Sequence, residues 1–315
     1  MAAKVSAVTI TWNSADEISG CIGSLVADGV GPGEITVVDN ASTDGTPELV
    51  AGRWPGVRLI QNAENVGFAA AANQGIAAST GEFVLLVNPD VSFGPGFTGR
   101  LVSAIEAEPA AGSAAPKLVR PDGRIDSAGL SMLKCRKAVD RGSGDKDTGQ
   151  FDVPARVFGA CGAAAMYRRA ALEDSRVMGE YFDEAFFAYK EDVDLAWRMN
   201  LLGWKCVYVP GAAGTHMRGW KAASRKDVPR FIRRHSFKNH YLTIMKNDDA
   251  VNMLAHLPWV MFYDIQLFFY ALIMEPFLLG SLWDIIKLMP DMTGKRDDIM
   301  ARRKAGPAGI RCLFG

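Results

Sequence analysis

Short apolar runs alternate with helical segments through residues 1–90, and no other feature restricts the fold so strongly. The strand-like runs are residues 4–11, 34–38, 57–61 and 83–87. The segments with helical spacing between them are residues 15–28, 46–54 and 68–79. Strands that alternate with helices build right-handed βαβ units, in which the strands lie parallel and helices cover both faces of the sheet. The sequence therefore predicts an α/β fold with a doubly wound, mostly parallel sheet.

The pattern changes after Pro116. Residues 120–152 are polar and rich in Gly, Asp and Lys, which predicts a long loop or hairpin, and a loop of that length is usually functional or disordered. The further predicted elements are a Gly/Ala-rich strand at residues 157–167, a helix at 192–202 and a strand at 205–209.

The charges divide the chain into two unlike parts. The 315 residues are 49% hydrophobic, enough for one large domain with an extension or for two domains. The 35 Lys and Arg balance the 35 Asp and Glu, but residues 1–130 hold 14 acidic and 7 basic side chains, a balance of −7, so residues 131–315 carry +7. Residues 215–246 contain nine Lys and Arg and one carboxylate, Asp227.

The five cysteines are scattered along the chain, and none lies in a Cys-x-x-Cys motif. This excludes a disulfide scaffold and a thiolate zinc site and favours a reducing compartment. The first residues have neither the apolar segment nor the cleavage site of a signal peptide. We therefore expect a cytoplasmic protein.

Short hydrogen-bonding side chains follow each of the four predicted strands. They are Thr11 and Asn13, Asp39 and Asn40, Asn65, and Asn88 and Asp90. Such residues also make turns, but four sets in succession predict a ligand site, because ligands bind at the carboxyl ends of strands in an open parallel sheet. The glycine-rich phosphate loops of dinucleotide-dependent dehydrogenases and P-loop ATPases are absent. A diphosphate bound among these carboxylates would need a bridging cation.

Three carboxylates lie in the first turn of the helix predicted from residue 192, in the run Glu191-Asp192-Val193-Asp194. The inner face of this helix would be Val193, Trp197 and Leu201. Consecutive helical side chains point about 100° apart, so the three carboxylates cannot share one role. Their interaction with the helix dipole is the simplest alternative and accounts for Asp194.

Six stretches in a fixed order, followed by His216, resemble a known family. They are TITWNS at residues 9–14, VVDNASTDGT at 37–46, NVGFAAAANQG at 65–75, LLVNPDV at 85–91, YFDEAFFAYKEDVDLAWRMN at 181–200 and GWKCVYVP at 203–210. Residues 4–220, about two thirds of the chain, resemble the family 2 glycosyltransferases with the GT-A fold, in the branch that includes bacterial rhamnosyltransferases of cell-wall and O-antigen assembly. No single stretch is decisive, but the ordered set is very specific.

The resemblance implies a catalytic domain at residues 1–220, with a nucleotide-sugar-binding half at 1–115 and an acceptor half at 116–220. Asp192 would be the base that deprotonates the acceptor hydroxyl, and Glu191 would orient the acceptor or the base. A third region, residues 221–315, would be a helical extension.

The family's Asp-x-Asp metal signature stands here as Asn88-Pro89-Asp90, so Asp90 is the one acidic ligand left. The resemblance makes His216 the second ligand of a divalent cation, Mg²⁺ or Mn²⁺. On the residues alone, a lone histidine is more often structural.

The remaining contacts to the nucleotide sugar also follow from the resemblance. The residues implied are Thr11, Asn13, Asp39, Asn40, Asn65, Asn73, Asn88, Asp90 and Arg218. Arg218 or Lys221 would clamp the diphosphate, and the alternative for both is a cation that is simply solvated.

We therefore expect an inverting, metal-dependent glycosyltransferase that moves a sugar from a nucleoside diphosphate to a glycan or polyprenyl-diphosphate-linked acceptor. Rhamnose on dTDP is the donor that the resemblance favours, and a UDP- or GDP-sugar is the alternative. A sugar-nucleotide pyrophosphorylase lacks support, because its glycine-rich signature is absent. A catalytically inactive carbohydrate-binding or scaffold protein is the alternative from another class.

The extension combines a basic helix with an apolar segment. The spacing of Arg230, Arg233, Arg234 and Lys238 puts them on one helix face, and residues 254–289 are aromatic and apolar but interrupted by prolines. This segment is predicted to be too interrupted to span a membrane and to lie in its interface, on the inner face of the cell membrane. Packing on the catalytic domain or in a homodimer is the alternative. Nucleic acid is not an expected partner, because no recognised binding motif is present.

Overall fold

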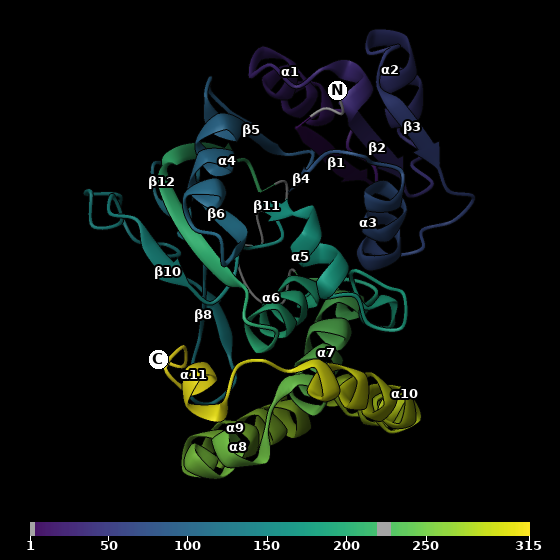
Figure 1. The fold of residues 1–315 in the computed structure, drawn as a ribbon. Coiled ribbons are helices and arrows are strands. Elements are labelled where there is room, and N and C mark those ends of the chain that lie inside the picture. The colour runs from purple at the N-terminus through teal and green to yellow at the C-terminus, as the bar shows by residue number, and fades with distance from the viewer. Residues whose placement is uncertain (1–3, 219–227) are drawn as a thin grey trace.

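The structure is a computed structural model that describes residues 4–218 and 228–315. One large sheet forms its centre, with helices on both faces (Figure 1). The strands on the main path of this sheet, in order across it, are β10 (Ala155–Val157), β12 (Lys205–His216), β6 (Ala111–Val119), β11 (Ala164–Arg168), β4 (Phe83–Val87), β1 (Val5–Thr11), β2 (Ile35–Asp39) and β3 (Arg58–Gln61).

Most of these strands point the same way. β1 is parallel to β2 and β4, β2 is parallel to β3, and β6 is parallel to β12. β11 is antiparallel to both β4 and β6, so β6 and β12 run in the direction of β1. The predicted doubly wound, mostly parallel sheet is confirmed, and the register that pairs Thr11 with Asp39 brings two predicted polar strand ends together.

The alternating faces of the strands supply two separate cores. Ala7 of β1 belongs to the core under α1 and α4, whereas the next residue, Val8, belongs to the core under α3. Gly75 allows α3 to approach the sheet, because a Cβ atom there would collide with Val8. The helices of this part are α1 (Ile18–Ala27), α2 (Thr46–Arg53), α3 (Phe68–Ala77), α4 (Phe97–Ala107), α5 (Arg169–Asp174) and α6 (Glu191–Leu201), with short 3₁₀ turns η1 (Pro32–Glu34) and η2 (Glu184–Phe186).

Two of the strand predictions are wrong in extent. The run 157–167 is not one strand, because β10 ends at Val157 and β11 starts at Ala164. Between them Gly159 packs against Ala196 of α6, where a Cβ atom would collide. The strand predicted at 205–209 continues as β12 to His216, where it pairs with β5 (Val91–Phe93). Residues 120–152 contain the short strand β7 (Ile125–Ser127) and a hairpin of β8 (Leu130–Met132) and β9 (Ala138–Asp140), as the hairpin alternative predicts.

The C-terminal region is helical, as expected, and lies below the sheet in Figure 1. Its elements are α7 (Arg230–Asn247), α8 (Ala250–Ala255), α9 (Leu257–Met274), η4 (Pro276–Leu279), α10 (Gly280–Arg302) and α11 (Pro307–Arg311). α7 packs against α6 and α10, and a third core, which includes Phe186, Leu242 and Met292, lies between them.

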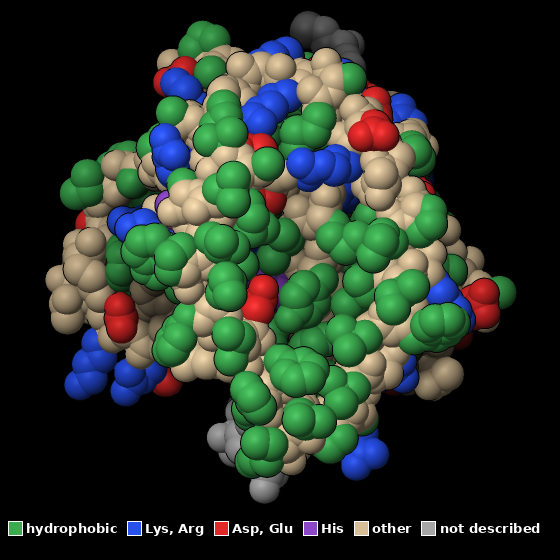
Figure 2. All heavy atoms as spheres, turned by 90° about the horizontal axis from the view of Figure 1, so that it is seen from below, with side chains coloured by type: hydrophobic (Ala, Val, Ile, Leu, Met, Phe, Trp, Pro, Cys, Tyr) green, Lys and Arg blue, Asp and Glu red, His purple; other side chains and the backbone are tan. Residues whose placement is uncertain are grey.

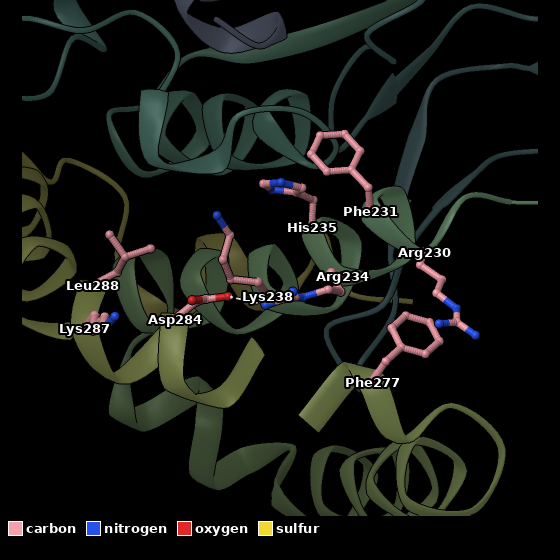
Figure 3. A pocket seen from close by; sticks show the side chains of 9 residues that line it. All are labelled: Arg230, Phe231, Arg234, His235, Lys238, Phe277, Asp284, Lys287 and Leu288. Atoms are coloured by element: carbon pink, nitrogen blue, oxygen red, sulfur yellow. Dashed lines mark hydrogen bonds and ion pairs between the residues drawn. The ribbon is translucent and has the colours of Figure 1, made fainter. Parts of the chain in front are cut away.

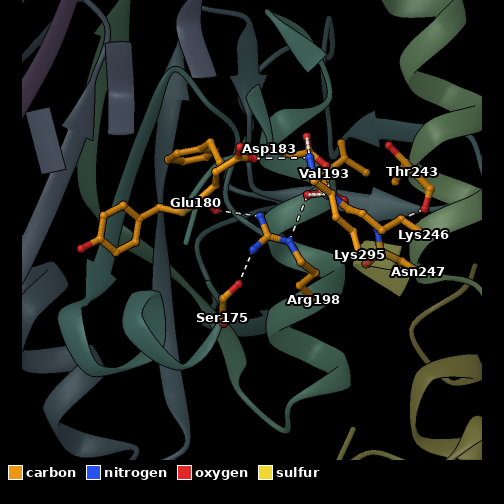
Figure 4. Close-up of polar contacts among 12 residues, drawn as sticks. Ser175, Glu180, Asp183, Val193, Arg198, Thr243, Lys246, Asn247 and Lys295 are labelled. Atoms are coloured by element: carbon orange, nitrogen blue, oxygen red, sulfur yellow. Dashed lines mark hydrogen bonds and ion pairs between the residues drawn. The ribbon is translucent and has the colours of Figure 1, made fainter. Parts of the chain in front are cut away.

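A buried ionic network joins this region to α6 (Figure 4). The Lys246 ammonium lies 2.5 Å from Asp183 and 2.8 Å from Asp194, and Arg198 also pairs with Asp194 at 3.0 Å. Lys295 of α10 lies 2.7 Å from Asp183. The interpretation that Asp194 interacts only with the helix dipole is therefore wrong, because its carboxylate is fully buried and pairs with Arg198 and Lys246.

The four cations expected on one face of α7 differ in their contacts. Arg233 pairs with Glu275 at 2.6 Å, and Lys238 is buried and donates to the Ala185 carbonyl at 2.6 Å. Arg230 and Arg234 remain exposed. The four cations therefore do not form one solvated or lipid-facing stripe.

α9 is long and apolar enough to cross a membrane by length and composition, with 18 residues and a mean hydropathy of 1.5. The prediction that the tail is too interrupted for such a helix does not hold here, because Pro258 lies in the first turn, where proline is tolerated. Only 11% of this helix is buried. Figure 2 shows hydrophobic side chains gathered over this face, and the exposed ones include Phe262, Phe269 and Trp283.

Candidate active site

The carboxyl ends of β1 and β2 form one end of the site. Thr11 donates a hydrogen bond to Asp39 Oδ1 at 2.8 Å, and the Ser42 backbone N–H donates to Asp39 Oδ2 at 2.9 Å. Asn13 accepts a hydrogen bond from the Thr43 N–H at 2.8 Å. The predicted residues Thr11, Asn13 and Asp39 therefore lie together at adjacent strand ends, with the Asp39 carboxylate buried and held in one orientation.

Three other predicted residues hold loops of the chain itself. Asn40 donates to the Gly67 carbonyl at 3.1 Å, and Asn65 accepts from the Gly67 N–H at 2.9 Å. Asn73 brackets Phe182 with two hydrogen bonds of 2.8 Å, one to its carbonyl and one from its N–H. Asn73 thus connects α3 to the segment that leads into α6, a structural role that the sequence did not indicate.

Asp90 and His216 come from elements far apart in the sequence. Asn88 and Asp90 follow β4, and the Asn88 N–H donates to the Ala163 carbonyl at 2.8 Å. His216 ends β12 directly opposite Val91 of β5, so the ladder between these strands sets its position. His216 Nε2 lies 3.3 Å from Asp90 Oδ1. The two predicted metal ligands are therefore neighbours.

Asp126 of β7 lies behind this pair and was missed in the sequence, where only the polarity of residues 120–152 pointed to function. Its Oδ2 lies 2.7 Å from His216 Nδ1, and its Oδ1 accepts from Arg120 at 2.9 Å and from Arg218. Burial alone would raise the pKa of Asp126, but hydrogen bonds from His216, Arg218 and Arg120 hold it well below its usual range. Burial alone would lower the pKa of His216, but hydrogen bonds to Asp126 and Asp90 raise it to about 9.

This arrangement fits a divalent cation. A histidine that binds a metal usually donates its other ring N–H to a carboxylate, and Asp126 is placed to accept it from Nδ1 while Nε2 faces Asp90. Residues 4–218 and 228–315 contain no group of three or more His, Cys, Asp or Glu side chains that could hold a metal ion. A cation at Asp90 and His216 would complete its shell with diphosphate oxygens and water, as Mg²⁺ commonly does.

Glu191 and Asp192 open α6 on the other side of the site. Asp192 Oδ2 accepts from the Gly162 N–H at 2.8 Å, and Oδ1 accepts from the Val193 N–H at 2.7 Å. Glu191 is buried, and its Oε2 has no hydrogen-bond partner in the described structure. Burial and then the charge of Asp192 raise the pKa of Glu191 to about 8, and burial also raises the pKa of Asp192. Burial therefore disfavours the charged form of both carboxyls, and Asp192, which exposes more of its surface than Glu191, keeps two N–H donors that favour its charge.

The loop that leads into α6 has strained backbone angles. Phe187, Tyr189 and Lys190 have φ angles of 65°, 71° and 67°, an unusual conformation for residues other than glycine. Asn239 of α7 holds the loop by donating to the carbonyls of Phe186, Ala188 and Tyr189 at 2.7–2.9 Å. No sequence signal distinguishes Asn239 from an ordinary helical asparagine.

Arg218 connects the two sides of the site. It pairs with Asp126 and lies 3.9 Å from Asp140 of β9, another residue that the sequence did not single out. Burial raises the pKa of Asp140 to about 6, and the charge of Asp192 contributes to this rise. The alternative that Arg218 is simply solvated is therefore wrong, and Lys221 lies outside the described residues.

Comparisons with known proteins identify the family. The sequence model of "Glycosyl transferase family 2" matches residues 6–176. The N-acetylglucosaminyl-diphospho-decaprenol L-rhamnosyltransferase of Mycobacterium tuberculosis is 32% identical over 236 residues, which are 66% of this chain and 74% of that protein.

Two solved structures are similar in fold. Staphylococcus aureus TarS 1-349 in complex with UDP-GlcNAc has a TM-score of 0.57 and 18% identity, covering 95% of this chain and 89% of that chain. The mannosyltransferase PcManGT of Pyrobaculum calidifontis, in complex with GDP-Man and Mn²⁺, has a TM-score of 0.55 and 18% identity, covering 96% and 86%. The expected GT-A fold with a helical C-terminal region is thereby confirmed. The chain belongs to glycosyl transferase family 2.

Proposed function

We propose that this glycosyltransferase moves rhamnose, with inversion, from dTDP-rhamnose to a saccharide carried on a polyprenyl diphosphate. The observation that carries the proposal is the Asp192 carboxylate, which two backbone N–H groups hold. One of them belongs to Gly162, and the carbonyl of the next residue, Ala163, accepts from Asn88 near the Asp90–His216 pair. The name of the mycobacterial relative supports both the donor sugar and the lipid-linked acceptor.

The reaction needs one protein base. The Asp192 carboxylate takes the proton of the acceptor hydroxyl, whose oxygen forms a bond to the anomeric carbon. The bond from that carbon to the donor diphosphate breaks on the opposite face, and the electron pair leaves with the nucleoside diphosphate. Such proton transfer is typically worth roughly 10²–10⁴-fold in rate. The neighbouring Glu191, whose pKa burial raises, has an unpartnered oxygen with which to orient the acceptor.

Asp90 and His216 would hold Mg²⁺ or Mn²⁺, which neutralises charge on the departing diphosphate. Arg218 would contact the same diphosphate. Thr11, Asn13 and Asp39 would contact the base and ribose, and Asn40, Asn65, Asn73 and Asn88 would shape that pocket. In this proposal residues 1–115 bind the donor, residues 116–220 bind the acceptor, and residues 221–315 form the extension.

The exposed face of α8, α9 and α10 would lie on the inner surface of the cell membrane. His240 of α7 meets α9 at Tyr263 and at Asp264, whose Oδ1 is 3.8 Å from His240 Nε2, so this side of α9 faces the protein. The opposite side exposes large apolar residues such as Phe262 and Phe269, which favours burial in the lipid interface.

A donor panel tests the reaction. The purified protein is mixed with Mn²⁺, a GlcNAc-diphospho-polyprenol acceptor and dTDP-rhamnose, UDP- or GDP-sugars in turn, and the product and its anomeric configuration are read by mass spectrometry and NMR. We expect transfer from dTDP-rhamnose with inversion. Faster transfer from a UDP- or GDP-sugar would show that dTDP-rhamnose is not the preferred donor. Binding of sugars without any transfer would favour an inactive carbohydrate-binding protein.

Vesicle flotation tests the membrane face. The double variant Phe262→Ser, Phe269→Ser should lose binding to vesicles of anionic phospholipid. The control Val153→Ser, Met178→Ser changes two exposed apolar residues in loops of the catalytic domain and should keep it. Equal binding by both variants argues against this face. A wild-type dimer in sedimentation that only the first variant dissociates would assign the face to a second copy.

A further inference from the structure

A hollow of about 750 Å³ lies between α7, η4 and α10, outside the site described above (Figure 3). Four cations line it, Arg230, Arg234 and Lys238 from α7 and Lys287 from α10, together with Phe231 and Phe277. It is therefore a basic hollow with aromatic walls, large enough for a small ligand.

The cations in this basic hollow exceed the carboxylates that could neutralise them. Asp284 is the one carboxylate that lines it, and it pairs with Arg234 at 3.0 Å. Among the described residues, Arg230 and Lys287 form no ion pair, and both are exposed. Two or more unneutralised cations that face one concave surface attract an anion.

Aromatic rings support these cations and provide an apolar wall. The Arg230 guanidinium lies 5.4 Å from the centre of the Phe277 ring, and the Lys287 ammonium lies 5.5 Å from that of Trp283. Phe231 is 50% exposed, although it lies beside the hollow. The combination suits a ligand with an anionic head and an apolar chain, because each part would find a matching surface.

The basic hollow lies between the catalytic loop and the apolar face. Phe187, on the loop before Asp192, contacts Phe231 and His235, with ring centroids 5.3 Å and 5.1 Å apart. On the other side, Trp283 belongs to the exposed apolar surface of α10. A lipid that entered from this surface would thus carry its head toward the loop that positions the base.

We propose that the basic hollow binds the diphosphate and first isoprene units of the polyprenyl-linked acceptor. Arg230 and Lys287 lie at opposite ends of the hollow, with the Arg234–Asp284 pair between them (Figure 3), so both side chains turn inward to contact the diphosphate. Phe231 and Phe277 contact the chain. This inference rests on the proposed function for the identity of the acceptor, and it adds the site where the acceptor's lipid part binds.

Titration with farnesyl diphosphate, measured by calorimetry, tests the proposal directly. The double variant Arg230→Ala, Lys287→Ala should bind it at least about tenfold more weakly, because each charge-assisted contact is worth a factor of that size. The matched control is Arg53→Ala, which removes an exposed guanidinium 5.7 Å from the Trp54 ring on α2 and should leave binding unchanged. The double variant Arg230→Lys, Lys287→Arg keeps the charges and should retain most of the affinity.

Further ligands distinguish a lipid diphosphate from inorganic diphosphate and from phospholipid headgroups. Inorganic diphosphate should compete with farnesyl diphosphate, and farnesol should bind much more weakly. Equal affinity of wild type and the alanine double variant for farnesyl diphosphate overturns the proposal. If that variant instead loses only binding to anionic phospholipid vesicles, the cations contact membrane headgroups and the acceptor subsite is wrong.

The same variant distinguishes this inference from the proposed function. With the long-chain acceptor, its KM for the acceptor should rise about tenfold or more, while its KM for the donor stays unchanged. Transfer with an unaltered acceptor KM refutes the hollow as a subsite but leaves the function standing. Absence of transfer in the wild type, with farnesyl diphosphate binding still dependent on Arg230 and Lys287, refutes the function but not the subsite.

Discussion

Two groups of carboxylates, between the start of η2 and the first turn of α6, differ in their partners. Asp194 and Asp183 are fully buried, and Lys246 alone lies within 2.8 Å of both. Asp192 and Glu191 have no ion pair among the described residues, and backbone N–H groups hold Asp192. The comparison teaches that the paired carboxylates join the extension to the domain, whereas the unpaired ones remain available to a substrate.

The pKa values of Asp183 and Glu191 shift in opposite directions for this reason. Burial alone would raise the pKa of Asp183, but the charges of Lys246 and Lys295 hold it well below its usual range. Burial, with no cation to offset it, raises the pKa of Glu191 to about 8. Opposite shifts in neighbouring carboxyls are a common sign that one group serves structure and the other chemistry.

Removal of the unpaired carboxylate should have the largest effect. We expect Asp192→Asn to lower kcat by roughly 10²–10⁴-fold, because the acceptor proton then has no base. Donor binding should change little, since the amide keeps the volume of the carboxyl. The melting temperature should fall slightly, because the amide nitrogen cannot accept one of the two backbone N–H bonds that the carboxylate accepts. Steady-state kinetics with calorimetric donor titration measures both, and wild-type turnover in this variant would contradict the assignment of the base.

Removal of a paired cation should have the converse effect, on stability rather than on chemistry. Lys246→Met leaves Asp183 and Asp194 short of a buried partner and should lower the free energy of unfolding by about 3–5 kcal/mol in urea titration. The control is Lys205→Met, which removes a partly exposed pair with Glu108 and should cost about 1 kcal/mol or less. Equal losses in the two variants would show that the network is not what holds the extension.

Asp126 sharpens the comparison, because it is a paired carboxylate at the active site. Asp126→Asn removes the charge that orients His216 and should weaken Mn²⁺ binding by roughly 10–100-fold. Calorimetric Mn²⁺ titration in the presence of dTDP measures this, with Asp122→Asn, an exposed neighbour, as the control. Unaltered Mn²⁺ affinity would limit Asp126 to a purely structural role.

A further prediction concerns the pH dependence of stability. The unfolded chain releases the Glu191 proton near pH 4.5, whereas the folded protein keeps it until about pH 8, so this group favours the folded state below pH 4.5 and the advantage is lost as the pH rises toward 8. Glu191→Gln should remove that loss between pH 5 and pH 8 in urea unfolding. Glu48→Gln, an exposed change on α2, should not, and parallel curves for wild type and Glu191→Gln would contradict the shift.

In the same experiment, the contribution of Asp183 to stability changes with pH in the opposite direction. Its folded pKa lies below the ordinary 3.8, so its contribution is present above that pH and is lost as the pH falls further. The Glu191→Gln variant should therefore retain the loss of stability in acid, because it leaves Asp183 and its lysines untouched.

Much of the first half of the fold could be predicted, because local pattern and tertiary environment agree there. The strand at 83–87 was predicted with its observed bounds, since it is apolar throughout and buried on both faces. The strand at 157–167 was predicted wrongly, because a Gly/Ala-rich run carries no information on where the backbone turns. Asp126, Asp140 and Asn239 could not be found, because each acts through a residue that is distant in the sequence.

The sequence by itself determined the sheet, the polar strand ends, the carboxylates at the start of α6 and the family, because these depend on periodicity and on short ordered motifs. Only the tertiary structure decided which carboxylates are neutralised. In the folded protein Lys246 pairs with Asp194, whereas Asp192 accepts hydrogen bonds only from backbone N–H groups among the described residues. Some cations of α7 form buried contacts, and others line the basic hollow. The physical reason is that charge pairing depends on distance and burial in three dimensions, and neither is encoded in the spacing of charges along a helix.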